Sequence, residues 1–185
     1  HPHLEVKIVD KAGQIVRAGT QGELCTRGYS VMKGYWNDPE RNKDAIRDGW
    51  MHTGDLAVFD DAGFCTITGR VKDMIIRGGE NIYPREIEEF LFAHPQVREV
   101  QVFGIPDELL GEVVCAWVVA AAHGDVSEDA LRQFCQGQIA HFKVPTHFKI
   151  VDELPMTITG KPQKFIMRDM MVAAMAGQVP GAIIR

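Results

Sequence analysis

Residues 68–84 read TGRVKDMIIRGGENIYP and mark the place where the character of the sequence changes. Before Arg70, short apolar runs alternate with turn residues, as is typical of a small β-rich unit. After Arg70, strand-like and helix-like segments follow one another. Pro84 can open the first of these helices, because its fixed φ suits the first helical position. The sequence therefore predicts a boundary between two structural units near residues 70–73.

Upstream of this boundary the pattern predicts strands joined by turns. Three runs have the composition of strands: HLEVKIVD (3–10), QIV (14–16) and GELCTRG (22–28). Asp38 can cap a brief helix whose first residue is Pro39. Residues 56–59 and 64–68 flank the turn residues 60–63 and predict a β-hairpin. Because the chain already alternates at its first residues like the middle of a sheet, we expect it to continue a longer protein.

Downstream of the boundary the sequence predicts an antiparallel α+β unit. Four runs are expected to be strands: residues 74–76, 97–105, 113–122 and 148–151. Three segments are expected to be helices: one from Pro84 to His94, one from Ser127 with helical spacing up to Ile139, and one over about 163–176. The run VVCAWVVAAA at residues 113–122 is apolar without a break, which predicts a strand covered on both faces.

The composition indicates a soluble globular protein and argues against several partners. The 185 residues are 45% apolar and carry a formal charge of -5, so a nucleic acid or an anionic membrane is not expected as the main partner. No run has the roughly 18 apolar residues of a spanning helix. The four cysteines stand far apart and the histidines form no helical ligand pair, so we expect no metal site and a reduced, cytoplasmic protein.

Two charged side chains near the boundary could bind a nucleotide, but each also has a plainer interpretation. Asp55, in TGD, could accept hydrogen bonds from the vicinal hydroxyls of a sugar, whereas an aspartate in a glycine turn is commonly structural. Arg70 could hold a ribose or a phosphate through its planar guanidinium, or could form only a surface ion pair.

Two further motifs lie beyond Arg70. Gly78 and Gly79 could approach an anion, but no Gly-Lys-Ser/Thr sequel follows and the next helix is acidic, so a turn is the better interpretation. Lys161 stands at the tip of a polar loop. A loop lysine could oppose charge on a transferring phosphoryl group, although most such lysines are simply solvated.

Taken in order, these motifs resemble one enzyme family. TGD, then GR with K-D, then RGGENIYPREIE, then TGK resembles the C-terminal third of the adenylate-forming superfamily, which includes acyl-CoA synthetases, aryl-CoA ligases, luciferases and peptide-synthetase adenylation domains. The resemblance extends to RGYSVMKGYWNDPERN, GWMHTGDLAVFDDAGF, VFGIPDELLGEVVCAWVV and HFKVP. The wording GGENIYPREIE with HFKVP is most similar to medium- and long-chain fatty acyl-CoA synthetases.

The resemblance implies a role for each motif. Asp55 would bind the ribose hydroxyls of ATP and AMP, Arg70 would help to hold the ribose and phosphate, and Lys161 would contact the carboxylate and the α-phosphate. Lys72 would be the hinge between the end of the large adenylating domain (1–71) and a mobile C-terminal lid domain (72–185). The segment Gly78, Gly79 and Glu80 would border the pantetheine tunnel once the lid has moved.

The resemblance also implies the reaction and its partners. A fatty acid would react with Mg-ATP to give acyl-AMP, and the acyl group would then pass to CoA, with at most transient membrane contact. The phosphate loop and the acyl pocket of the family are expected upstream, so this chain should not adenylate alone. Two alternatives stay open: a carrier protein instead of CoA as the acceptor, or a non-catalytic module that keeps the fold.

Overall fold

The computed structural model describes residues 2–121 and 126–177 and contains two compact units, and the chain passes from one to the other between Lys72 and Asp73. Each unit has a sheet of its own. The junction lies in a single turn of 3-10 helix over Val71–Asp73. It falls within the range where the sequence changes character.

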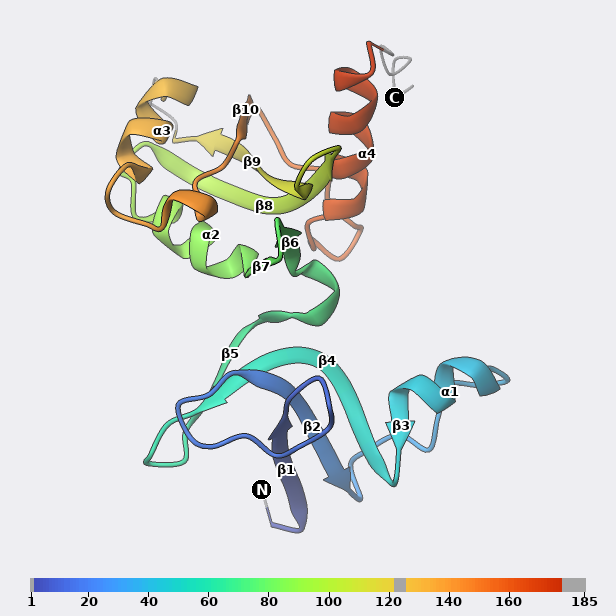
Figure 1. The fold of residues 1–185 in the computed structure, drawn as a ribbon. Helices are drawn as coiled ribbons and strands as arrows, with labels where there is room; N and C mark the ends of the chain where they lie inside the picture. Colours follow the sequence, from blue (N-terminus) through green and yellow to red (C-terminus); the bar gives the residue numbers. More distant parts are fainter. Residues whose placement is uncertain (1, 122–125, 178–185) are drawn as a thin grey trace. The chain divides into compact units, whose positions relative to one another are not determined.

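The first unit is an antiparallel sheet with one short helix. Its strands are β1 (Leu4–Val9), β2 (Gly22–Gly28), β3 (Ile46–Arg47), β4 (Trp50–Phe59) and β5 (Cys65–Arg70), and its helix is α1 (Pro39–Ala45). β2 lies between β1 and β4, and β5 pairs with β4 (Figure 1). The predicted strands at 3–10 and 22–28 and the predicted hairpin are confirmed. The Asp38 carboxylate accepts a hydrogen bond from the backbone of Arg41 at 3.0 Å and caps α1, as expected.

The predicted strand at residues 14–16 is wrong. Only an isolated bridge forms there, between Val9 and Ile15. The reason is the side chain of Asp10, which accepts hydrogen bonds from the backbone N–H groups of Ala12 and Gln14 at 2.9 Å each. Such an Asx turn takes backbone donors that a strand would need, so the chain turns instead of extending.

The second unit is a five-stranded sheet with helices on both faces. Its strands are β6 (Ile75–Arg77), β7 (Glu80–Ile82), β8 (Val97–Asp107), β9 (Gly111–Ala120) and β10 (His147–Val151); its helices are α2 (Pro84–Phe92), α3 (Glu128–Cys135) and α4 (Lys164–Met175), with a 3-10 turn at His141–Lys143. The predicted α+β class is confirmed. None of the helices within the described ranges is long and apolar enough to cross a membrane.

One strand of the second unit runs in a direction that the sequence did not predict. β8 and β9 form an antiparallel hairpin, but β10 pairs with β9 in parallel. The segment between β9 and β10 includes α3. A crossover of this kind returns the chain to the end of the sheet where β9 began, which makes the next strand parallel.

β9 is the buried centre of the second unit, as its unbroken apolar run predicted. Its alternate residues Val114, Ala116 and Val118 pack with residues of α2 and α3, while Cys115, Trp117 and Val119 pack against Met167 of α4. Figure 1 shows α2 and α3 on one side of the sheet and α4 on the other. The last residue of the predicted strand, Ala122, lies outside the described residues.

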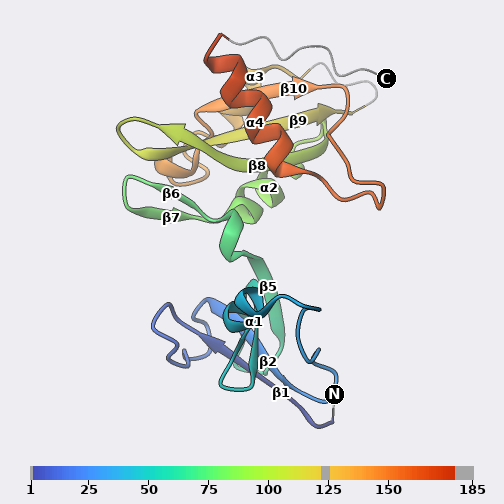
Figure 2. The ribbon, with the colours of Figure 1, turned by 90° about the vertical axis from the view of Figure 1, so that its right-hand side faces the viewer.

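The structure also corrects the end of α3 and adds a strand. α3 stops at Cys135, so Ile139 lies beyond the helix although it still packs against the core. Gly137 has φ +71°, a left-handed conformation that commonly follows a helix end. β7 was not predicted; it pairs with β6 as a short hairpin, visible in Figure 2.

The burial of the cysteines predicts their reactivity. Cys25, Cys115 and Cys135 are buried and Cys65 is exposed. Burial raises the pKa of Cys115 to about 12 and that of Cys135 to about 11, so almost no reactive thiolate exists at pH 8. We expect N-ethylmaleimide to label Cys65 promptly and the other three only on unfolding, as measured by peptide mass spectrometry with and without denaturant. Rapid labelling of Cys115 in the native protein would contradict this packing.

Candidate functional site

Asp55 and Arg70 form an ion pair on neighbouring strands of the first unit. Asp55 of β4 stands opposite Arg70 of β5 in the sheet register, and the Arg70 Nε donates to the Asp55 Oδ1 at 2.8 Å. The Arg70 side chain is 65% exposed and that of Asp55 29%. A pair this exposed contributes little to stability. Both side chains are therefore accessible to a ligand.

A bulge in β4 sets the direction of Asp55. In the register of β2 and β4, Glu23 stands opposite Leu56 and Cys25 opposite His52, so Leu24 alone faces the triplet at residues 53–55. Gly54 lies within this triplet with φ +73°, which favours glycine. Bulges commonly redirect a side chain beside an active site.

The hydroxyl of Thr53 stabilises the bulge through two hydrogen bonds. It donates to the carbonyl oxygen of Leu24 at 2.8 Å and accepts from the backbone N–H of Asp55 at 3.1 Å. The Thr53 side chain thus replaces ladder contacts that the bulge interrupts. The residue that precedes Gly54 in the TGD motif therefore has a structural role next to Asp55.

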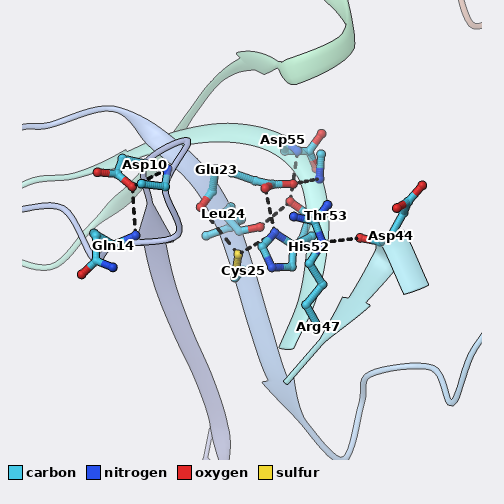
Figure 3. A network of polar contacts seen from close by, with 12 residues as sticks. Asp10, Gln14, Glu23, Leu24, Cys25, Asp44, Arg47, His52, Thr53 and Asp55 are labelled. Carbon is cyan, nitrogen blue, oxygen red and sulfur yellow. Dashed lines mark hydrogen bonds and ion pairs between the residues drawn. The ribbon is translucent and has the colours of Figure 1, made fainter. Parts of the chain in front are cut away.

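Three residues outside the motifs predicted to form the site surround the same bulge. Glu23 accepts from the backbone N–H of Gly54 at 3.1 Å, and its other oxygen lies 2.7 Å from the Nδ1 of His52. The Cys25 Sγ is 3.5 Å from the same Nδ1 (Figure 3). GEL lies on a strand that the sequence predicted, whereas HTGD precedes the strand predicted at residues 56–59 and belongs to β4 only in the structure. A prediction that these two segments pair as neighbouring strands of one sheet would have brought Glu23, Cys25 and His52 together.

Glu23, Cys25 and His52 could in principle hold a metal ion, since their donor atoms all lie within 4.8 Å of one another. The sequence had predicted no metal site. Two ligands of one zinc ion stand about 3.3 Å apart, because each bond is about 2.0 Å and the geometry is tetrahedral. The separation of 2.7 Å between Glu23 and His52 is that of a hydrogen bond. Burial, with the charge of Glu23, also raises the pKa of the Cys25 thiol. The observed arrangement is therefore a hydrogen-bonded cluster.

Lys161 ends a tight turn in the second unit. The backbone N–H of Thr157 donates to the Lys161 carbonyl at 2.8 Å, and the Lys161 N–H donates to the Thr157 hydroxyl at 3.0 Å. Gly160 has φ +75°, and Met156 and Pro162 form a bridge at the base of the turn. Both backbone polar groups of Lys161, its N–H and its carbonyl, are thus hydrogen-bonded, and the residue is exposed to solvent. The ammonium of Lys161 is therefore carried on a backbone of fixed conformation.

The Gly78-Gly79 pair forms the turn of the β6–β7 hairpin. Their φ angles are +57° and +89°, as a type I′ turn requires. A Cβ at Gly79 would meet nothing within 4 Å, whereas one at Gly78 would lie 3.2 Å from Leu110. Glu80 follows on β7 and is exposed, as is Lys72 in the 3-10 turn between the units. The conformation explains both glycines, and a role of this segment in a tunnel stays a prediction.

Two family models match the chain in complementary places. The AMP-binding enzyme model matches residues 1–36, and the AMP-binding enzyme C-terminal domain model matches residues 86–161. Both describe parts of the same kind of enzyme, and the second match lies within the second structural unit.

Curated relatives are similar in sequence to this chain along nearly its whole length. It is 55% identical over 91% of its length to the putative acyl-CoA synthetase YngI of Bacillus subtilis, of which it covers 31%. It is 47% identical over 92% of its length to the human medium-chain acyl-CoA ligase ACSF2, mitochondrial, of which it covers 28%. The chain thus spans less than a third of these relatives.

Solved structures share the fold. ATP-bound MatB from Rhodopseudomonas palustris has a TM-score of 0.87 at 38% identity, over 91% of this chain and 34% of that one. The o-succinylbenzoate CoA synthetase of Bacillus subtilis, solved with its acyl-adenylate intermediate, has a TM-score of 0.81 at 36% identity, over 92% of this chain and 34% of that one. With the motifs in order on this fold, the chain belongs to the adenylate-forming AMP-binding enzymes and carries their C-terminal domain.

Proposed function

We propose that these residues are part of an AMP-forming acyl-CoA synthetase that activates a fatty acid. The enzyme would convert the acid and Mg-ATP to acyl-AMP and pyrophosphate, and would then transfer the acyl group to CoA. The observation that carries the proposal is the ion pair between Asp55, at the β4 bulge, and Arg70 of β5. It presents a carboxylate and a guanidinium, joined at 2.8 Å, in the two motifs to which the family resemblance assigns nucleotide binding.

The two side chains are chemically suited to a ribose that carries a phosphate. A carboxylate accepts hydrogen bonds only, so it suits the two vicinal hydroxyls of a ribose, which can both donate. The guanidinium supplies fixed donors for the phosphate or ribose oxygens and retains its charge at all ordinary pH values.

Lys161 would serve the first half-reaction. Attack of a carboxylate on the α-phosphate brings anionic oxygens together, and a positioned ammonium opposes the charge that develops. The turn at Thr157 holds the backbone of Lys161, so the remaining freedom lies in the side chain. We propose that the loss of this ammonium slows adenylation by roughly a hundredfold or more.

The second half-reaction would use other residues of the same unit. Thiolysis of acyl-AMP has no comparable need for Lys161. We propose that the second unit is a lid that turns about Lys72 and brings Gly78, Gly79 and Glu80 beside the pantetheine of CoA. The open space around Gly79, where a Cβ would meet nothing within 4 Å, is compatible with the close approach of a ligand.

The assignment of a fatty acid and of CoA rests on similarity alone. The curated relatives carry names of acyl-CoA synthetases and medium-chain acyl-CoA ligases, which supports both. A carrier protein as the acyl acceptor is the alternative in the same class. A non-catalytic module is the alternative in another class, but a binding module has no evident need for Asp55, Arg70 and Lys161 together.

The proposal is tested by loss of free thiol in the complete enzyme, supplied with Mg-ATP, CoA and a ladder of fatty acids. We expect ATP-dependent consumption of the CoA thiol that varies with chain length. Pyrophosphate release without thiol loss would instead indicate a carrier protein as the acceptor. If neither product forms with any acid, the non-catalytic module becomes the better interpretation.

A substitution at Lys161 separates the two half-reactions. Lys161→Ala should reduce acyl-AMP formation by roughly a hundredfold, because the charge that opposes the developing anion is lost. Thioester formation from supplied acyl-AMP should stay largely intact. Pyrophosphate release and thioester yield are measured beside Lys11→Ala, which removes an exposed lysine from the turn after β1. Equal loss of both half-reactions would overturn the role of Lys161.

A substitution at Lys72 tests the hinge. Lys72→Pro should slow thioester formation more than adenylation, because proline fixes φ and removes a backbone N–H in the 3-10 turn at residues 71–73. Lys72→Ala, which keeps the backbone free, is the matched control. An unchanged ratio of the two single-turnover rates in the proline variant would place the hinge elsewhere.

A further inference from the structure

The β4 bulge places backbone groups of the TGD motif outside the regular ladder. The pairing of β2 and β4 resumes only at Leu56 on one side and His52 on the other. Backbone groups between these points need other partners if they are shielded from water. The N–H of Gly54 is one of them, and it finds the carboxylate of Glu23 at 3.1 Å.

Glu23 connects both ends of the bulged segment. One of its oxygens accepts from Gly54, which directly precedes Asp55, and the other lies 2.7 Å from the Nδ1 of His52, which precedes the triplet. A carboxylate only accepts, so the Nδ1 of His52 carries the proton and donates it. The side chains of His52 and Glu23 are 13% and 23% exposed, so water competes weakly for these contacts (Figure 3).

The contact at Gly54 lies directly before the Asp55 carboxylate in the chain. Gly54 adopts φ +73°, and a rotation there would swing Asp55 away from Arg70. The Thr53 hydroxyl holds the Asp55 N–H, and Glu23 holds the N–H one residue earlier. Two successive backbone donors before the Asp55 carboxylate are thus held by side chains, which is the kind of support that fixes a binding geometry.

We infer that Glu23 is a positioning residue that holds the TGD bulge so that Asp55 meets the ribose hydroxyls, with His52 orienting the Glu23 carboxylate. This inference rests on the proposed function, because it takes Asp55 as the acceptor for the ribose. It assigns to the GEL motif a part in nucleotide selection, although Glu23 itself need not touch the nucleotide.

The test compares ATP with 2′,3′-dideoxy-ATP in pyrophosphate release by the complete enzyme. The wild type should prefer ATP by roughly a hundredfold in kcat/KM, because each hydrogen bond from a hydroxyl to a charged acceptor is worth about tenfold or more. Asp55→Ala should abolish most of this preference. Glu23→Ala should lower the preference by roughly tenfold, because this variant keeps Asp55 but loses the hydrogen bond from Gly54 that holds the backbone before it.

Two variants act as controls for Glu23→Ala. Glu23→Gln keeps an oxygen for the Gly54 N–H, and its amide N–H group can donate to the His52 Nδ1 once the proton of that ring moves to Nε2, so most of the preference should return. Glu5→Ala removes a carboxylate that pairs with Arg27 across β1 and β2 of the same sheet and should leave the preference unchanged. The preference is a ratio measured on one preparation, so it does not depend on how much of a variant folds.

The outcomes distinguish the positioning role of Glu23 from the ribose role of Asp55. If Asp55→Ala lowers the preference and Glu23→Ala lowers only the rates with both nucleotides equally, the positioning role is overturned while the ribose site stands. If the wild type does not discriminate, or Asp55→Ala does not reduce discrimination, the ribose role of Asp55 in the proposed function fails. Should Glu23→Ala yield no folded protein, Glu23→Gln and His52→Ala provide the same ratio, and an unchanged preference in His52→Ala would contradict the orienting role of His52.

Discussion

Backbone polar groups that are shielded from water and have no partner in a sheet ladder need other partners, and specific contacts supply such partners in three candidate functional segments of the chain. In the first unit the N–H of Gly54 leaves the ladder and is taken by Glu23. In the second unit the N–H of Lys161 is taken by the Thr157 hydroxyl, and that of Gly78 by the Leu110 carbonyl at 2.8 Å. Irregular backbone is thus kept in one conformation by specific contacts.

In the second unit, two carboxylates likewise accept hydrogen bonds from backbone N–H groups. Glu88 of α2 accepts from the N–H of Val102 at 2.8 Å and from the Lys164 ammonium at 2.7 Å. Glu112 of β9 accepts from the N–H of Ile76 at 3.0 Å and pairs with Arg168 at 3.1 Å. Both pairs join α4 to the rest of the unit. Because α4 begins three residues after Lys161, these contacts fix the base of the turn that carries it.

The sequence predicted local features well where one residue type has one dominant physical effect. Asp38 and Ser127 cap their helices through side-chain oxygens, and Pro84 opens α2, as expected. It failed at the strand expected over residues 14–16, where the Asp10 side chain withdrew donors that a strand requires. At this place a turn-forming side chain competes with the strand propensity of the following residues. Which of the two prevails depends on the position of the Asp10 carboxylate relative to the backbone N–H groups, and composition does not give that position.

The sequence by itself determined the α+β class, the motifs in their order and the apolar core strand, because each follows from periodicity or from residues adjacent in the chain. Only the tertiary structure decided that β10 runs parallel to β9 and that Glu23, Cys25 and His52 gather behind Asp55. Both depend on strand pairing and register between segments distant in sequence, such as those of Glu23 and His52, which are 29 positions apart. A shift of one residue in that register would turn Glu23 to the opposite face of the sheet, away from the bulge that it supports.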